Sequence, residues 1–371
     1  MSVDAAKLPE GCPPLNSYYV YLTGGCNLAC RHCWIAPRFQ ANGGTGGHLD
    51  YGLFVQAIEE GLPLGLSHVK LTGGEPLLHP DFVRMVDLLK AKDLGLTIET
   101  NGTLLTPSLA RYLKDKSTLT FITVSLDGAE AATHDAFRGV EGSFNRACQA
   151  IRDLVEVGYR PQVIMSVHEG NLEEAGALVQ LAESLGAGSV KLGMVQSSGR
   201  GEQMQQRGQL LDVHRLIEFG RWVDAYLQPR VSIPVYYNWS LAFYTIRRLL
   251  DMDGYTCHIF GILGILHTGQ LSMCGIGTQV PDLCYGMLGQ DRVADIWTSH
   301  PILVALRKQL PKNLTGICGE CILRSHCLGM CVAQNYHLSH ELNAAHWFCQ
   351  EVDRAGLFPE SRRQRNQPSA A

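Results

Sequence analysis

The sequence predicts an α/β protein: a partial (β/α)6 barrel followed by a small, cysteine-rich α+β domain. Three observations support this. Strand and helix patterns alternate over residues 18–195, polar or glycine-rich motifs directly follow several of the strands, and most cysteines gather in two separate clusters. Active sites of parallel barrels lie at the carboxyl ends of the strands. The motifs that follow the strands therefore predict one site at that mouth of the barrel.

Six strand–helix units account for the barrel. Residues 82–89 carry apolar side chains at helical spacing, and Thr106 before Pro107 has the pattern of a helix start. A loop rich in glycine and glutamine at 197–209 precedes a last helix at 210–227. The six predicted strands are 18–23, 68–72, 96–102, 119–128, 161–167 and 189–195.

A chain of 371 residues is too long for one small core, so we expect more than one domain. We expect residues 16–227 to form the barrel and residues 257–358 the cysteine-rich domain, with an aromatic bridging region at 228–256. Residues 1–15 are an N-terminal extension, and 359–371 form a polar, flexible tail.

The composition narrows the class of function. Apolar residues make up 46% of the chain and charged residues 18%, which excludes a mostly disordered protein. A net charge of −4 is not typical of nucleic-acid binding, no run is long enough to cross a membrane, and no secretory signal is seen. We therefore expect a cytoplasmic protein. Thirteen cysteines, an odd number without signs of export, favour metal binding over disulfides.

The first cysteine cluster follows the first strand with the spacing C-x3-C-x2-C, at Cys26, Cys30 and Cys33. Three thiolates can hold three irons of a 4Fe–4S cluster and leave the fourth iron open to a substrate or cofactor. Three ligands thus indicate chemistry rather than a closed structural site. The alternative is a zinc site that includes His32.

The second cluster spans the C-terminal third, and its central run reads C-x2-C-x5-C-x3-C. Buried cysteines can also serve as small apolar core residues, an interpretation that suits Cys148 better than either cluster. The members of the second cluster are Cys257, Cys274, Cys318, Cys321, Cys327, Cys331 and Cys349.

The first cluster, together with a Gly-Gly-Glu-Pro motif after the second strand, resembles the radical S-adenosylmethionine (SAM) superfamily. The resemblance covers about residues 16–227. It implies that the three thiolates hold a 4Fe–4S cluster whose open iron binds SAM. The other residues implied for SAM are Gly73, Gly74 and Glu75 at the methionyl amine, Ser125 and Asp127 at the ribose, Arg146 at the carboxylate and Trp34 at the adenine.

Two of these assignments have competitors. Arg138 competes with Arg146 for the carboxylate, although either arginine could simply lie on a helix surface. Trp34 could be an ordinary core residue.

The second cluster resembles the SPASM domain, which carries two auxiliary 4Fe–4S clusters. The resemblance assigns Cys318, Cys321, Cys327 and Cys349 to one of them, and Cys257, Cys274 and Cys331 to the other. The second set is one ligand short. Two alternatives follow: its fourth iron is open to substrate, or another group such as Cys284 closes it. The clusters could accept electrons, bind substrate or only stabilise the domain.

The resemblance implies a maturase that uses a 5′-deoxyadenosyl radical to modify a ribosomally made precursor peptide, by a cross-link, a thioether or a backbone change. One alternative is a sulfatase-maturing enzyme that forms formylglycine. Relatives of that type carry an acidic residue after the cysteine that corresponds to Cys274, where this chain has Gly275. The other alternative is an iron–sulfur electron carrier. Expected partners are the precursor peptide, a separate leader-recognition protein and an electron donor such as flavodoxin or ferredoxin.

Overall fold

The computed structural model describes residues 8–42, 44–250 and 257–364. Parts of the expected extension, bridging region and tail (1–7, 251–256 and 365–371) lie outside these ranges. None of the helices in the described ranges has both the length and the apolar character needed to span a bilayer.

One mixed sheet forms the centre of the molecule, and it contains all six predicted strands. Its order is β12-β11-β10-β1-β4-β5-β6-β7-β8-β9, with parallel pairing from β10 through β1 to β9. The fourth predicted strand ends at 125 instead of 128. The bounds are β1 Ser17–Tyr21, β4 His68–Thr72, β5 Gly95–Thr100, β6 Leu119–Ser125, β7 Gln162–Val167, β8 Ser189–Met194, β9 Val235–Tyr237, β10 Ile262–Ile265, β11 Gln270–Ser272 and β12 Cys284–Met287.

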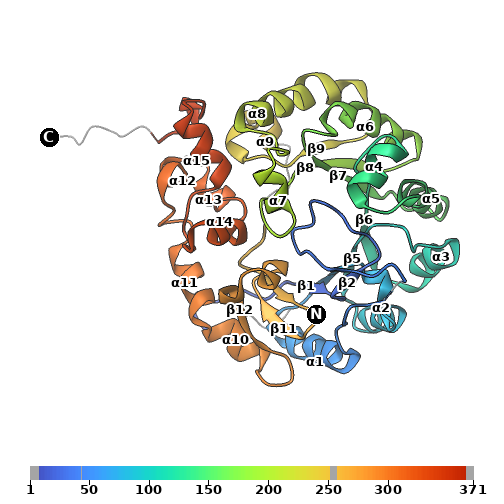
Figure 1. The fold of residues 1–371 in the computed structure, drawn as a ribbon. Coiled ribbons are helices and arrows are strands. Elements are labelled where there is room, and N and C mark those ends of the chain that lie inside the picture. Colours follow the sequence, from blue (N-terminus) through green and yellow to red (C-terminus); the bar gives the residue numbers. More distant parts are fainter. Residues whose placement is uncertain (1–7, 43, 251–256, 365–371) are drawn as a thin grey trace.

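Alternating burial along the strands separates an outer apolar core from an inner polar face. On β4, Val69 and Leu71 are fully buried, whereas Lys70 between them lies on the opposite face. Helices cover the outer face of the curved sheet, and the segment after β1 lies across its interior (Figure 1). This arrangement confirms the predicted partial barrel, with polar side chains directed into its lumen.

The sheet continues beyond the predicted barrel at both edges. In the expected bridging region, β9 pairs with β8, and from the cysteine-rich region β10 pairs in parallel with β1. These additions cover the edges that a six-stranded sheet would leave unpaired. The cysteine-rich region is therefore not a separate globule, since its first strands belong to the barrel sheet and share its apolar core.

The helices differ from the prediction mainly after β8. The expected loop at 197–209 contains the helix α7, because Met204 packs with Phe137 and Val195 in a small apolar cluster that the polar composition hides. The predicted helix at 210–227 starts three residues later as α8 and ends in a π-helical turn at Val223–Leu227.

The helices α1 to α6 lie along the outside of the barrel, α7 lies nearer the centre, and most of the later helices line one side of the molecule (Figure 1). Their bounds are α1 Tyr51–Gly61, α2 Phe82–Ala91, α3 Pro107–Lys116, α4 Ala131–Arg138, α5 Ser143–Glu156, α6 Ala175–Ser184, α7 Gly201–Gln206, α8 Val213–Trp222, α9 Ile246–Leu250, α10 Val293–Ser299, α11 Pro301–Gln309, α12 Gly316–Glu320, α13 Arg324–Cys327, α14 Val332–Ser339 and α15 Trp347–Arg354.

Candidate active site

The loop after β1 brings three cysteines together at the mouth of the barrel. Cys26 and Cys30 are each 5% exposed and pack with Cys33 around Leu28. The Leu28 backbone N–H donates to Cys26 Sγ at 3.4 Å. Burial raises the pKa of Cys26 and Cys30, and the neighbouring thiols raise both further. Three thiols that share one buried space are suited to bind a cationic group, because ligation requires their deprotonated form.

The arrangement of the three thiols fits a cluster better than a single ion. Within the described ranges, the set offers three thiolates and no fourth cysteine, which suits a cluster with one open iron. A 4Fe–4S cube takes each thiolate on a different iron, so its ligands lie further apart than those of one zinc ion. His32, the alternative zinc ligand, instead stacks on Phe137 at a ring-centroid distance of 4.5 Å.

A buried ion pair lies directly beside the cysteine loop. Arg138 Nε lies 2.6 Å from Asp127 Oδ2, and Arg138 Nη1 approaches Cys30 Sγ at 3.5 Å. Burial opposes ionisation of Asp127, but Arg138, helped by two neighbouring histidines and the Ser166 N–H, lowers the pKa of Asp127. The pair thus holds a positive charge next to one cysteine, where thiolate charge would be stabilised.

The Gly-Gly-Glu-Pro segment packs against the same loop. A Cβ at Gly74 would lie 1.7 Å from the Gly25 carbonyl oxygen, so only glycine permits this approach. The Glu75 carboxylate is buried and accepts hydrogen bonds from Thr100 Oγ1 at 2.6 Å and the Asn101 N–H at 2.9 Å. Burial raises the pKa of Glu75 to about 7. The Glu75 side chain therefore fixes this segment to Thr100 and Asn101 at the end of β5. Gly73 and Gly74 allow the backbone of the segment to approach the cysteine loop closely.

The remaining predicted SAM contacts have different placements. Ser125 is half-buried at the end of β6, and its hydroxyl makes no hydrogen bond within the described ranges. Trp34 packs edge-to-face on Tyr21, with ring centroids 6.2 Å apart. Arg146, by contrast, is exposed, and its guanidinium donates to the Glu141 carbonyl oxygen at 3.4 Å. The structure therefore brings Arg138, and not Arg146, to the cysteine loop.

Two site residues were not predicted from the sequence. Asn101 donates to Asn27 Oδ1 at 2.9 Å and approaches Cys26 Sγ at 3.7 Å. Asn101 directly follows β5, and this position at a carboxyl strand end is the signal that could have identified it. Asn27 lies inside the cysteine motif and offered no separate signal.

Four C-terminal cysteines line one small apolar cavity. They are Cys318, Cys321, Cys327 and Cys349, the set that the sequence pattern assigns to one auxiliary cluster. The cavity wall is completed by Leu314, Ile317 and Phe358, among others. Four converging thiols with an apolar surround suit a fully ligated cluster, so the residues fit that group.

The third set, Cys257, Cys274 and Cys331, gathers at the barrel lumen. Burial raises the pKa of Cys257 and Cys274, and the neighbouring Cys331 thiol raises both further. Cys257 and Cys274 also raise the pKa of Tyr19 on the inner face of β1. Cys284 donates to the Gly277 carbonyl oxygen at 3.5 Å. The three thiols fit a cluster that borders the lumen.

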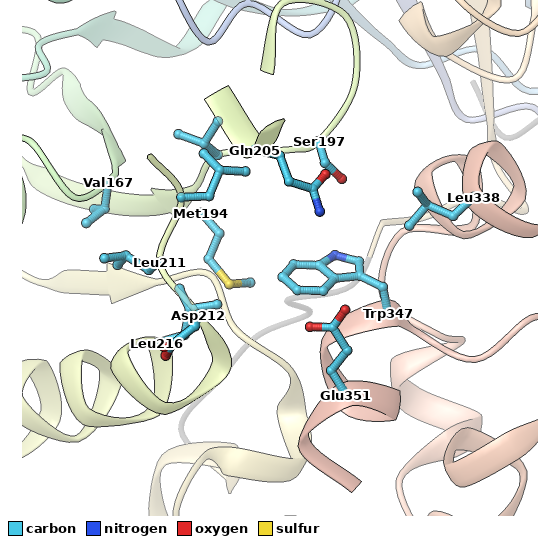
Figure 2. A pocket seen from close by; sticks show the side chains of 12 residues that line it. Val167, Met194, Ser197, Gln205, Leu211, Asp212, Leu216, Leu338, Trp347 and Glu351 are labelled. Carbon is cyan, nitrogen blue, oxygen red and sulfur yellow. The ribbon is translucent and has the colours of Figure 1, made fainter. Parts of the chain in front are cut away.

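An open pocket lies beside the barrel mouth, between the ends of β7 and β8 and the helices α14 and α15. Val167 and Met194 line it from the strands, and Leu338, Trp347 and Glu351 from the helices. Figure 2 shows the Met194 side chain and the Trp347 indole extending toward one another across it. A substrate could reach the carboxyl ends of the strands from this pocket.

Comparison with known proteins agrees with this geometry. The Radical SAM superfamily profile matches residues 20–182. An AdoMet-dependent heme synthase of Methanosarcina barkeri is 29% identical, over 85% of this chain and 90% of its own. Mycofactocin maturase MftC of Mycobacterium tuberculosis is 27% identical, and the match covers 85% of this chain and 78% of MftC.

Among solved structures, Streptococcus suis SuiB bound to its precursor peptide SuiA has a TM-score of 0.70 and 18% identity. The match covers 91% of this chain and 76% of SuiB, which shows a shared fold. A profile match over the barrel, three thiols at its mouth and relatives that match far beyond it lead to one conclusion. The chain is an enzyme of the radical SAM superfamily that uses S-adenosylmethionine and has a SPASM-type, cysteine-rich C-terminal region.

Proposed function

We propose that this enzyme modifies a peptide by hydrogen abstraction inside the barrel, and that it is a maturase of a ribosomally made precursor. The observation that carries the proposal is the position of the lumen between two three-thiol sets. One set lies at its mouth and comprises Cys26, Cys30 and Cys33. The other set borders its wall, where Cys257 and Cys274 raise the pKa of Tyr19. A substrate in the lumen would lie between the radical source and an electron acceptor.

In this proposal the residues at the mouth have defined roles. A 4Fe–4S cluster with SAM, when bound, supplies the 5′-deoxyadenosyl radical. Cys26, Cys30 and Cys33 would hold that cluster. Gly73 and Gly74 allow SAM a close approach to the backbone, and Ser125 offers a free hydroxyl. The barrel wall would exclude water from the radical.

A peptide substrate is supported by the relatives and by the pocket at the mouth. A PqqA peptide cyclase of Methylocella silvestris, whose name states a peptide substrate, matches 88% of this chain, and the mycofactocin maturase matches 85%. The pocket between Met194 and Trp347 would give an extended chain access to the lumen. A leader-recognition protein and a flavodoxin or ferredoxin donor are part of the proposal.

A second candidate is chemistry on a tetrapyrrole, as the name of the heme synthases suggests. One observation favours it: the heme synthases of Methanosarcina barkeri and Nitratidesulfovibrio vulgaris match 85–92% of this chain and 90–94% of their own length. The match to MftC covers a smaller share of that protein's length, 78%.

The formylglycine alternative meets a steric obstacle. A Cβ at Gly275 would lie 2.4 Å from the Tyr21 ring and 2.7 Å from Trp34. An acidic side chain therefore has no room after Cys274 in this packing. We expect Gly275→Asp to lower the melting temperature without creating formylglycine activity on a cysteine-containing sulfatase peptide.

The test of the proposed function uses anaerobically reconstituted enzyme with SAM and dithionite. We expect about twelve irons per chain, if all three clusters form, and reductant-dependent 5′-deoxyadenosine. A small peptide encoded beside the gene, deuterated in its core, should transfer deuterium to 5′-deoxyadenosine. Deuterium transfer from a propionate-bearing tetrapyrrole and not from the peptide would refute the peptide proposal in favour of the second candidate.

A further inference from the structure

Three charged side chains lie on the inner face of the barrel: Lys70 on β4, Glu99 on β5 and Lys191 on β8. Each stands between two neighbours that are buried against the outer helices, and successive side chains of a strand point to opposite faces. Lys70 pairs in register with Tyr19 of β1, and Lys191 lies between Ile164 of β7 and Tyr236 of β9. The two lysines thus belong to opposite walls of one lumen.

Lys70 already has partners within the protein. Its Nζ lies 3.2 Å from Glu99 Oε1 and 3.7 Å from the centroid of the Tyr19 ring. Burial disfavours the charged form of Lys70, but Glu99, Tyr19 and Cys257 together raise its pKa. Lys70 and Glu99 therefore form a neutral pair on one wall.

Lys191 has no such partner. Over the described part of the chain it makes no hydrogen bond and no ion pair, although Glu99 attracts it across the lumen. Burial lowers the pKa of Lys191. Two lysines and one glutamate leave one formal positive charge in the lumen. Lys191 is half-buried, and an unpaired ammonium withdrawn from water is costly unless an anion meets it.

We propose that Lys191 is an anion subsite of the substrate cavity and that it binds a carboxylate of the substrate. This inference rests on the proposed function, because it places the substrate in the lumen. The carboxylate could belong to an acidic residue of a peptide or to a propionate of a tetrapyrrole. In both cases the ammonium would position the substrate beside the Cys257 set. Cys257 is close enough to Lys191 to raise the pKa of that lysine electrostatically.

The test measures binding to the reconstituted holoenzyme with SAM in the absence of oxygen. The probes are a capped pentapeptide with one central glutamate, its glutamine twin, and hemin, which presents two propionates on a non-peptide frame. Calorimetry follows the peptides and the absorbance of the Soret band follows hemin. We expect the wild type to bind at least one carboxylate probe, and to bind the glutamate peptide about tenfold more tightly than its twin if peptides enter.

The variants isolate the charge of Lys191. Lys191→Met should weaken carboxylate binding by about tenfold or more, whereas Lys191→Arg should largely retain it. Lys116→Met, at the exposed end of α3, is the matched control and should bind as the wild type does. Lys191→Gln is the second neutral variant, used if Lys191→Met does not fold.

The inference is overturned if the neutral variants keep the carboxylate preference or if the wild type binds no carboxylate probe. It is also overturned if both neutral variants lose about four irons, since Lys191 would then serve the cluster. Hemin binding that depends on Lys191, without peptide binding, would support the subsite and contradict the peptide proposal. Failure of the proposed function shows separately, as absence of deuterium transfer from the peptide.

Discussion

The cysteine loop at the barrel mouth and the four-cysteine cavity in the C-terminal region use the same ligand in opposite settings. Cys26, Cys30 and Cys33 are three thiols approached by charged and polar side chains, among them Arg138. The C-terminal cavity has four thiols among mostly apolar side chains, with Ser240 and Arg324 as the polar exceptions. The difference teaches that the number of thiols and the polarity around them together distinguish a reactive site from a closed one.

The third set combines features of both. Like the set at the mouth, it has three thiols, at Cys257, Cys274 and Cys331. These thiols face the lumen and its lysines, as expected of a cluster that binds substrate. Removing one thiol or one charge from a single region at a time therefore tests whether the mouth and the cavity differ in this way.

The largest expected effect follows removal of one thiol at the mouth. Cys30→Ala should abolish reductant-dependent 5′-deoxyadenosine, because the cluster that binds SAM would lose one of only three ligands. Iron should fall by about four per chain while the auxiliary clusters remain. The measurements are anaerobic chromatography of the nucleoside and an iron assay. Retained cleavage of SAM in this variant would contradict the assignment of the mouth.

A smaller effect on activity, but a large one on stability, should follow loss of a thiol in the cavity. In Cys327→Ala the apolar cavity would lack a closed cluster, and we expect the melting temperature to fall by about 10 °C or more. Iron should again fall by about four. Cys148→Ala, a buried cysteine outside all three sets, is the control and should keep its iron. An unchanged melting temperature in Cys327→Ala would show that this cluster does not stabilise the fold.

The third prediction concerns the ion pair at the mouth. Arg138→Met leaves Asp127 buried without its counter-charge, which should lower the free energy of unfolding by about 3–5 kcal/mol. Arg146→Met is the matched control, because Arg146 is exposed and should change stability by less than about 0.5 kcal/mol. Anaerobic urea unfolding and SAM titration measure both variants. A larger loss of SAM affinity in Arg146→Met than in Arg138→Met would restore Arg146 as the carboxylate ligand.

The smallest effect is a pH dependence that comes from Glu75. Burial raises the pKa of Glu75 to about 7, from 4.5, so the folded protein binds a proton more tightly than the unfolded chain. The free energy of unfolding should therefore decrease as the pH rises from about 4.5 to about 7, by up to about 3 kcal/mol. Glu75→Gln should flatten this slope in urea unfolding between pH 4 and 8. An equal slope in both proteins would exclude Glu75 as its source.

Much of the fold could be predicted from the sequence, because its signals are local. The six strands follow from apolar runs, and the helix α3 follows from Thr106 before Pro107, where Thr106 Oγ1 accepts from the Leu109 N–H at 3.2 Å. The cysteines at the mouth follow from spacing along the chain, whereas the set in the cavity was implied by the resemblance to the SPASM domain. The limits of the domains remain a prediction, since one sheet crosses them.

The sequence alone determined what depends on neighbours in the chain: the strands, the cysteine sets and the glycines that follow β4. Only the tertiary structure decided which side chains from distant elements share a space. It placed Arg138 instead of Arg146 beside Cys30 and left Lys191 without a partner in the lumen. The physical reason is that spacing sets the direction of a side chain on its own element, whereas the packing of elements sets its distance to every other charge.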